Sequence, residues 1–365
     1  MHVLAERGFS GGEHQLRHVL RHLAGEGHES VLALNPEAKF KPHALDLGLA
    51  VHEVRMRNDV DLGATARLRR LFREVAPDLI HLACSRSHKL GAHASIGMSG
   101  CAPKVTTRRM DYSLPRSRYR RWLYGRAMAA VIVVSRGVRD AVLRIGVEPE
   151  RVCLIFDGVD ADGLALVSEG RVAARAELGL DDATLCGVTT ASLHERKGID
   201  VLIQALGTLE AVGDTRLVWI CAGEGPERAA LQRAAQALPA HVEVRFPGQV
   251  PDVRPLLAAA DLFALPSRKE GLGVALLEAM AVGLPVVASG VGGIMDAVEP
   301  DVSGLLVRPA DAGALATAID RLRQDAQLRQ RLGGAASMRV QQRFSVRDMC
   351  IQTEQLYRRL SGATI

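Results

Sequence analysis

The sequence has few aromatic residues and lacks the patterns of an exported or membrane-spanning chain. Only 4% of its 365 residues are Phe, Trp or Tyr. No apolar run reaches the roughly 18 residues of a spanning helix, and no basic segment followed by an apolar one opens the chain. The six cysteines lie far apart without a C-x-x-C pair, which is typical of buried thiols. We therefore expect a cytoplasmic protein.

Several familiar site motifs are missing as well. Nothing reads as a P-loop, and no G-x-G-x-x-G follows a strand and opens a helix. Residues 8–12 match G-x-S-x-G, the nucleophile elbow of hydrolases, which gives an alternative interpretation as an α/β-hydrolase-like esterase that uses Ser10. This motif follows the first strand of the chain, so no earlier strand is present to build an oxyanion loop. We do not favour the hydrolase for this reason.

The chain is long enough for two domains, and 48% of its residues are apolar. Short apolar or β-branched runs alternate with longer helical patterns, which is typical of βα units and parallel sheets. Strands are predicted at residues 2–5, 29–34, 50–54, 78–82, 104–107, 130–134 and 152–155, and then at 184–191, 216–222, 242–246, 262–265 and 285–288. The pattern predicts an α/β fold with two Rossmann-like domains, residues 1–165 and 166–345, joined through a turn-rich passage at 157–171.

The net charge of +5 is unevenly placed. Residues 104–126 carry eight cations against one anion, together with four of the six Tyr and Trp residues. Between Arg116 and Arg126, the spacing of Tyr119, Trp122 and Leu123 gathers rings and cations on one side, as in helices at an anionic membrane surface. A solvated helix face is the alternative explanation. Nucleic acid is not favoured, because no recognised motif accompanies the charge.

The segment from Ser267 to Val282 is the richest in site-forming residues. Glu270 and Glu278 lie just over two helical turns apart, so a helix that begins near Gly273 lets both carboxylates address one cleft. Glycines in this segment allow backbone N–H groups to approach an anion, which the start of a helix also favours.

The longer stretch FALPSRKEGLGVALLEAMAVGLPVVASGVGGIMDAVEPDVSGLL, residues 263–306, resembles the donor-site signature of the retaining glycosyltransferases of glycosyltransferase family 4. Shorter matches support the resemblance over most of the chain: residues 10–13 (SGGE), 133–135 (VVS), 157–160 (DGVD, where the family usually reads Asn-Gly-Val-Asp), 222–226 (AGEGP) and 246–248 (FPG). The resemblance implies the B-type architecture, in which two Rossmann-like domains face each other across a cleft. It also implies that the C-terminal helix, residues 346–365, packs back on the first domain.

The resemblance assigns roles to individual residues. Glu278 is expected to bind the ribose hydroxyls of a nucleotide sugar, Glu270 to lie near the transferred sugar, and Lys197 to neutralise the diphosphate leaving group. The expected donor-binding set comprises Gly11, Gly12, Ser192, Arg196, Lys197, Gly248, Glu270, Gly271, Leu272, Gly273 and Glu278.

Two positions depart from the family pattern. Ser192 stands where the family places an arginine, so either Arg196 or an arginine from elsewhere substitutes, or leaving-group stabilisation is weaker. In the first domain, many relatives read Thr-x-His-Gly where residues 106–111 read TTRRMD. This version resembles lipopolysaccharide-type members, and it makes Arg109 and Asp111 the candidates for acceptor contacts and catalysis, beside Lys197 and Glu270.

The sequence thus predicts a retaining transfer of a sugar from a uridine or guanosine diphosphate donor to a glycan or lipid-linked acceptor, in cell-envelope polysaccharide or lipopolysaccharide synthesis. A non-catalytic carbohydrate-binding protein is the further alternative. We expect no cofactor and no metal, because cationic side chains and helix N-termini can hold the diphosphate. The two D-x-D patterns, at residues 59–61 and 160–162, are interpreted as loop features. The expected partners are the donor, the acceptor and the anionic inner face of the membrane, with no nucleic acid.

Overall fold

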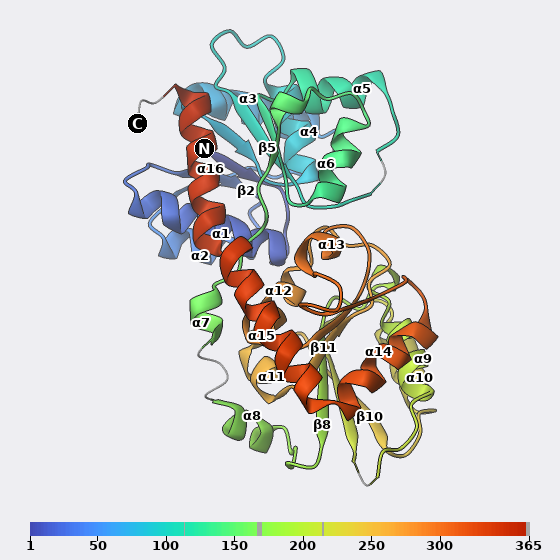
Figure 1. Ribbon diagram of the computed structural model, residues 1–365. Coiled ribbons are helices and arrows are strands. Elements are labelled where there is room, and N and C mark those ends of the chain that lie inside the picture. Colours follow the sequence, from blue (N-terminus) through green and yellow to red (C-terminus); the bar gives the residue numbers. More distant parts are fainter. Residues whose placement is uncertain (113, 166–169, 214, 363–365) are drawn as a thin grey trace. The chain divides into compact units, whose positions relative to one another are not determined.

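The computed structural model describes residues 1–112, 114–165, 170–213 and 215–362. The chain forms two compact units: unit 1 is Met1–Asp157 with Val346–Ile365, and unit 2 is Gly158–Ser345 (Figure 1). The two units divide at 157/158, within the turn-rich passage expected to join them and eight residues before the predicted boundary at 165/166. Val159 forms a parallel bridge with Ser345, and its N–H donates to the carbonyl of Phe344 at 2.9 Å, so the chain already belongs to unit 2 at that residue.

Unit 1 contains one parallel sheet of seven strands in the order β3-β2-β1-β4-β5-β6-β7. Its strands are β1 (His2–Leu4), β2 (Val31–Leu34), β3 (Ala50–Glu53), β4 (Ile80–Leu82), β5 (Lys104–Arg108), β6 (Ala130–Val133) and β7 (Val152–Leu154), and each coincides with a predicted strand. The connecting helices are α1 (Gly11–Gly25), α2 (Lys41–Asp46), α3 (Leu62–Val75), α4 (Ser85–Ala94), α5 (Arg118–Arg121), η1 (Trp122–Arg126), α6 (Arg136–Leu143) and η2 (Pro149–Arg151). The strand order reverses between β1 and β4, in register at His2 and His81.

Unit 2 contains a second parallel sheet, with six strands in the order β10-β9-β8-β11-β12-β13. Its strands are β8 (Leu185–Thr190), β9 (Leu217–Ala222), β10 (Val242–Gly248), β11 (Leu262–Leu265), β12 (Val286–Ser289) and β13 (Leu305–Val307). Its helices are α7 (Ala161–Ala165), α8 (Arg171–Glu177), η4 (Glu195–Lys197), α9 (Ile199–Gly207), α10 (Arg228–Ala235), α11 (Arg254–Ala259), α12 (Val274–Ala281), α13 (Ile294–Ala297), α14 (Ala312–Gln324) and α15 (Ala326–Arg343). The sequence missed β13, because three residues at a sheet edge give too short an apolar run to stand out.

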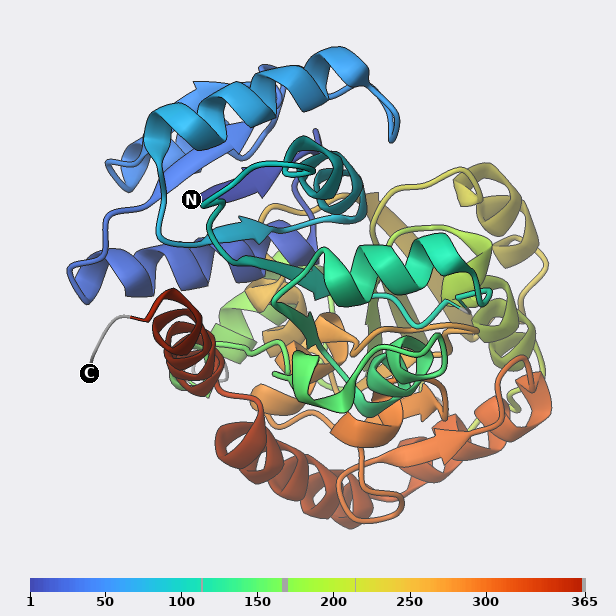
Figure 2. The ribbon, with the colours of Figure 1, turned by 90° about the horizontal axis from the view of Figure 1, so that it is seen from above.

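The last helix, α16 (Val346–Ser361), follows unit 2 in sequence but packs on α1 in unit 1. Figure 2 shows it in dark red beside the blue α1. Its apolar residues, among them Met349 and Leu356, join Val19 and Leu23 in one core cluster. The carboxylate of Glu354 contacts His22 at 2.8 Å and His28 at 2.9 Å, which ties α16 to α1 and to the loop that follows α1.

None of the helices that the structure describes combines the length and the apolar character that a bilayer crossing requires.

Candidate functional site

The main candidate site lies at the carboxyl edge of the unit 2 sheet. Strand order reverses between β8 and β11, so the loops that leave these two strands run in opposite directions across the sheet and leave a crevice between them. The loop after β8 contains Ser192, Arg196 and Lys197, and the loop after β11 contains Glu270. Most of the donor-side candidates therefore come together at the point where parallel sheets of this kind bind ligands.

Glycines allow these loops to pack closely. Gly198 has a φ of 67°, and a side chain there would collide with the carbonyl of Pro266 at the end of β11. Gly223, after β9, has a φ of 150°, and a side chain there would collide with the carbonyl of Ala191. The N–H of Arg268 also donates to the carbonyl of Arg196 at 2.8 Å. The loops after β8, β9 and β11 thus form one tightly packed edge.

Lys197 and Glu270 form an ion pair between two of these loops. Both side chains are largely buried, with 13% of the lysine and 9% of the glutamate exposed. Ser267 donates its hydroxyl to Glu270 Oε2 at 3.2 Å, and the N–H of Gly271 donates to Oε1 at 3.2 Å. Sequence reasoning gave Ser267 no role of its own, although this residue opens the segment that it singled out; in the structure the hydroxyl holds the carboxylate in place. The structure therefore brings the lysine and the first glutamate of the predicted site into direct contact.

Glu278 lies on the second turn of α12, which begins directly after Gly273 with its φ of 88°. The side chain is half-buried, and within the described part of the chain no protein group donates a hydrogen bond to it. Burial raises the pKa of this carboxyl to about 7, and the negative charge of Asp252 adds to the shift. A half-buried carboxyl without a donor can accept hydrogen bonds from the hydroxyls of a ligand.

Two arginines near Lys197 differ in availability. Arg268 is fixed, because its two terminal nitrogens donate to the carboxylate of Asp200 at 2.7 and 2.6 Å. Arg196 is half-buried, and its guanidinium makes no hydrogen bond or ion pair with the residues that the structure describes. Ser192, where the family pattern has an arginine, is half-buried in the same loop. Arg196 is therefore the cation that remains free to act beside Lys197.

The remaining donor-side glycines and Leu272 occupy different positions. Gly271, Leu272 and Gly273 are buried in the turn that leads into α12. Gly248 ends β10 with a φ of 89°, and its carbonyl accepts from the N–H of Gly223 at 2.8 Å. It lies on the outermost strand of the sheet, two strands away from β8.

The first-domain candidates lie in unit 1. Gly11 and Gly12 open α1, and a side chain at Gly12 would lie 3.6 Å from Cδ of Arg109. Nε of Arg109 donates to both oxygens of Asp157, at 3.2 and 3.3 Å. Asp111 is half-buried two residues further along the same loop. Sequence reasoning gave Asp157 no role, although its position departs from the asparagine that the family usually carries.

Ser10 caps α1. Its hydroxyl donates to Glu13 Oε2 at 2.6 Å, and its N–H donates to the same oxygen at 2.8 Å. The backbone of Ser10 is extended, with φ −133° and ψ −174°, as helix N-caps usually are, and lacks the strain of a nucleophile elbow. The G-x-S-x-G pattern is thus a helix start, and it gives no support to the esterase.

Three of the four D-x-D aspartates contact protein groups. Asp59 pairs with Lys89, and Asp61 caps α3 by accepting from the N–H of Ala64 at 2.8 Å. Asp160 accepts from the N–H of Gly163 at 3.1 Å. Among the described residues, no group of three or more His, Cys, Asp or Glu side chains has the arrangement of a metal site. Metal independence stays a prediction.

The cationic stretch does not form the single helix face that its spacing predicted. It divides into the short α5 and the π-helical turn η1, and Leu123 is buried within η1. The rings of Tyr119 and Trp122 stack on His93, with centroid distances of 5.8 and 5.6 Å. The exposed side chains of the stretch are those of Arg116, Ser117, Arg118, Tyr119, Arg121 and Arg126. The cations remain at the surface, while most of the apolar groups pack inward.

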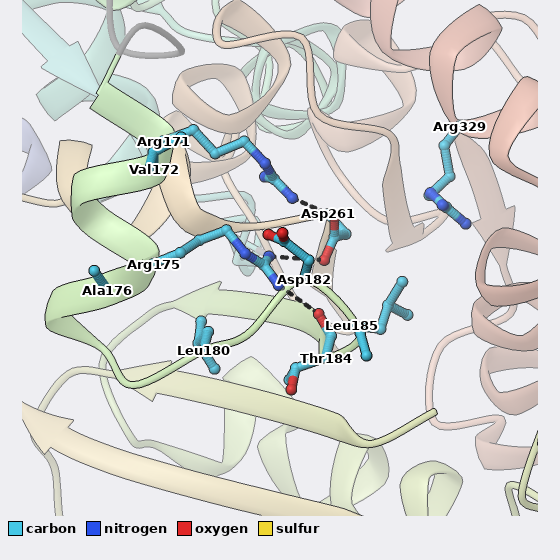
Figure 3. A pocket seen from close by; sticks show the side chains of 11 residues that line it. Arg171, Val172, Arg175, Ala176, Leu180, Asp182, Thr184, Leu185, Asp261 and Arg329 are labelled. Carbon is cyan, nitrogen blue, oxygen red and sulfur yellow. Dashed lines mark hydrogen bonds and ion pairs between the residues drawn. The ribbon is translucent and has the colours of Figure 1, made fainter. Parts of the chain in front are cut away.

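A cavity of about 360 Å³ lies at the other edge of the unit 2 sheet, near the amino ends of β8 and β11. Figure 3 shows Arg171 and Arg175 pointing from α8 toward Asp261. Arg171 donates to Asp261 Oδ1 at 2.6 Å, and Arg175 donates to the carbonyl of Thr184 at 2.6 Å. These bonds anchor α8 to the sheet, and they lie away from the edge that carries Lys197 and Glu270.

Two Rossmann-like units with a charged site at a sheet switch point place the chain among the open α/β proteins, which bind their ligands at such a point. Two family models match the chain. Residues 9–162 match the model described as Glycosyltransferase Family 4, and residues 173–339 match the model described as Glycosyl transferases group 1. Both models thus describe glycosyltransferases, one along most of unit 1 and the other along most of unit 2.

Two curated relatives show the degree of similarity. The chain is 34% identical to the alpha-maltose-1-phosphate synthase of Mycolicibacterium smegmatis over 65% of its own length and 64% of the relative. It is 38% identical to the D-inositol 3-phosphate glycosyltransferase of Salinispora tropica over 54% of its own length and 44% of the relative. The aligned stretches thus span less than two thirds of these relatives.

Solved structures match over nearly the whole chain. HepE from Anabaena, in complex with UDP-glucose, superposes with a TM-score of 0.84 at 24% identity, over 97% of this chain and 98% of that one. WaaG, a glycosyltransferase involved in lipopolysaccharide biosynthesis, superposes with a TM-score of 0.74 at 17% identity, over 100% of both chains. At these identities the likeness concerns the fold.

The raised pKa of Glu278 predicts how stability depends on pH. An unfolded carboxyl ionises near 4.5, whereas the folded one stays protonated to about 7, so its ionisation costs stability as pH rises through this window. Glu278→Gln should leave the free energy of unfolding unchanged below pH 4.5. At pH 8 it should raise that free energy by about 3 kcal/mol at most. Urea unfolding at several pH values checks this, with exposed Glu177→Gln as the control. An equal effect of Glu278→Gln at pH 4 and pH 8 would contradict the assignment.

Proposed function

We propose that this protein is a retaining glycosyltransferase, which moves a sugar from a nucleotide diphosphate donor to a glycan or lipid-linked acceptor in cell-envelope polysaccharide or lipopolysaccharide synthesis. The observation that carries the proposal is Glu278, a half-buried carboxyl that accepts no hydrogen bond from the residues the structure describes, on the helix that follows Glu270 of the Lys197–Glu270 pair. The likeness in fold to HepE, which was solved with UDP-glucose, supports a nucleotide-sugar donor.

The donor would be bound by groups that are already in place. The carboxylate of Glu278 accepts two hydrogen bonds from the ribose hydroxyls. Lys197 turns from Glu270 to the diphosphate, where negative charge grows as the bond from the sugar to the phosphate breaks. Glu270, released from the lysine, then accepts hydrogen bonds from the transferred sugar. Retention at the anomeric carbon is carried over from the family resemblance.

Arg196 would supply the second cation of the leaving-group site. It replaces the arginine that the family pattern places at Ser192, because its guanidinium has no partner among the described residues, whereas Arg268 is held by Asp200. A planar guanidinium can bind two phosphate oxygens at once. Leaving-group stabilisation would then come from Lys197 and Arg196 together.

The acceptor would contact unit 1 through Arg109, with Asp111 nearby in the same loop. An anionic acceptor suits this site, because the guanidinium of Arg109 lies beside the start of α1, where the helix dipole also favours negative charge. The names of both curated relatives include a phosphorylated sugar or alcohol, which supports a phosphorylated acceptor.

Nucleotide-sugar binding should depend on Glu278 and on pH. Between pH 6 and pH 8 the affinity of the wild type for its nucleotide sugar should rise about tenfold, because only the ionised carboxyl accepts from the diol. Glu278→Gln should weaken binding by roughly 10- to 100-fold at pH 8 and remove the pH dependence. Calorimetry with UDP-glucose and GDP-mannose measures both effects, with Glu177→Gln as the control. Unchanged affinity in Glu278→Gln with the fold intact would refute the role of this residue.

Hydrolysis of a panel of nucleotide sugars tests the activity itself. At least one donor should be turned over, and chelator should leave the rate unchanged. Lys197→Ala should lower turnover on the order of 100-fold, and Arg196→Ala should lower it as well, because each removes a cation from the leaving group. Arg233→Ala, which removes an exposed cation on α10, is the matched control. If no donor in the panel is hydrolysed or transferred, the proposed function is wrong; if Arg196→Ala matches Arg233→Ala, Arg196 does not replace the missing arginine.

The surface cations of the stretch from Arg116 to Arg126 would bind the anionic inner face of the membrane. Each basic side chain near such a surface contributes about 1 kcal/mol, so changing Arg118, Arg120 and Arg121 to Ser should weaken binding to anionic vesicles by roughly two orders of magnitude. The matched control removes three exposed cations of unit 2, Arg233, Arg308 and Arg343. Sedimentation with phosphatidylglycerol vesicles at low and high salt measures the effect, since salt screens surface charge. Equal sedimentation of both triple variants would leave the stretch as a solvated surface.

A further inference from the structure

We propose that Asp157 is a positioning residue that orients the guanidinium of Arg109 toward an anionic group, a phosphate or a carboxylate, on the acceptor. This inference rests on the proposed function and names a residue to which neither the sequence nor the comparisons gave a role.

The contact uses one side of the arginine only. Nε of Arg109 donates to both oxygens of Asp157, at 3.2 and 3.3 Å, and the terminal nitrogens make no hydrogen bond with the described residues. Asp157 is buried, with 7% of its side chain exposed, whereas 22% of the Arg109 side chain is exposed. The buried carboxylate therefore fixes the plane of the guanidinium and leaves its two outer nitrogens for a ligand. A planar fork of this kind matches the oxygens of a phosphate or a carboxylate.

The free end of the arginine lies at the start of α1. A side chain at Gly12 would lie 3.8 Å from Nη1 of Arg109, so this nitrogen reaches the first turn of a 15-residue helix. Glycine at this position keeps the space beside the guanidinium open. An anion held by Arg109 would therefore also meet the positive end of the helix dipole.

A buried network holds the strand from which Arg109 extends. Thr107 Oγ1 lies 2.8 Å from Nε2 of His81, and Nδ1 of His81 lies 2.7 Å from the hydroxyl of Tyr357 on α16. Burial, with a further contribution from Arg109, lowers the pKa of His81 to about 3, so the ring stays neutral. The end of β5, from which Arg109 extends, is thus held by uncharged groups. The orientation of the Arg109 guanidinium itself depends on Asp157.

Two departures from the family pattern meet in this contact. The segment with Arg109 stands where many relatives read Thr-x-His-Gly, and Asp157 stands where the family usually reads asparagine. A largely buried arginine needs a counter-charge, because an unpaired buried charge is costly. An asparagine at position 157 could not supply one. The two departures are therefore explained together, as one charged pair.

Phosphate titration of the full-length protein tests the inference. Inorganic phosphate is the probe, and the amide signal of Gly12 and the Nε–H signal of Arg109 are followed by NMR. The wild type should show saturable shifts at both signals. Arg109→Ala should abolish the Gly12 shift, and Asp157→Asn should weaken phosphate binding by roughly tenfold or more. Glu148→Gln, which breaks an exposed pair with Arg151 in the same unit, is the control and should change nothing.

The double variant separates positioning from a structural role. If Asp157 acts by orienting the guanidinium of Arg109, Asp157→Asn should have little further effect on phosphate binding in the Arg109→Lys background, because lysine keeps the charge but has no planar guanidinium to orient. Asp157→Glu serves as the test if the Asn variant does not fold. It keeps the negative charge but moves the carboxylate by one methylene, so it should also weaken phosphate binding. Wild-type affinity in either Asp157 variant would overturn the inference, as would an unchanged Gly12 shift in Arg109→Ala. Nucleotide-sugar hydrolysis by the wild type is read separately, so its absence would overturn the proposed function and leave the phosphate result standing.

Discussion

The direction of the strands in unit 2 determines where its chemistry can lie. All six strands are parallel, so every loop that leaves the carboxyl end of a strand lies at the same edge, and the reversal between β8 and β11 separates two of these loops. Lys197 and Glu270 meet only because of this reversal, since 73 positions of sequence separate them. The close packing at Gly198 and Gly223 then fixes the distance between the loops. Without this constraint, the ion pair and the unbound Arg196 would have no common site.

The two carboxylates of this site differ in the hydrogen-bond partners that the protein gives them. Glu270 is buried and fully engaged by Lys197, Ser267 and Gly271. Glu278 is half-buried on the helix that follows, without a donor in the described part of the chain, and its pKa is raised because ionisation is costly there. Above pH 4.5, a neutral side chain at this position would therefore make the protein more stable. A glutamate at such a position is understandable if a ligand supplies the missing hydrogen bonds.

The sequence predicted the alternation of strands and helices because buried parallel strands read as short apolar runs, and all but the three-residue β13 could be recognised. It also predicted that Lys197 and Glu270 belong to one site, because the family resemblance gave each of them a role there. It could not predict the domain boundary, since Val159 pairs with Ser345, a residue that becomes its neighbour only in the folded chain. For the same reason the sequence did not predict the contact between Arg109 and Asp157. It also placed the rings near Arg116 at the surface, whereas two of them stack on His93.

The path of α16 has a consequence for synthesis of the chain. This helix covers α1 in the first unit, but the ribosome makes it after the whole of the second unit. Until Glu354 contacts His22 and His28, one side of the apolar core around Val19 and Leu23 stays uncovered. Unit 2 can thus complete its core while the chain is still being translated, whereas the unit that begins the sequence is the last to be finished. The core of the first unit therefore cannot be completed before α16 has been made.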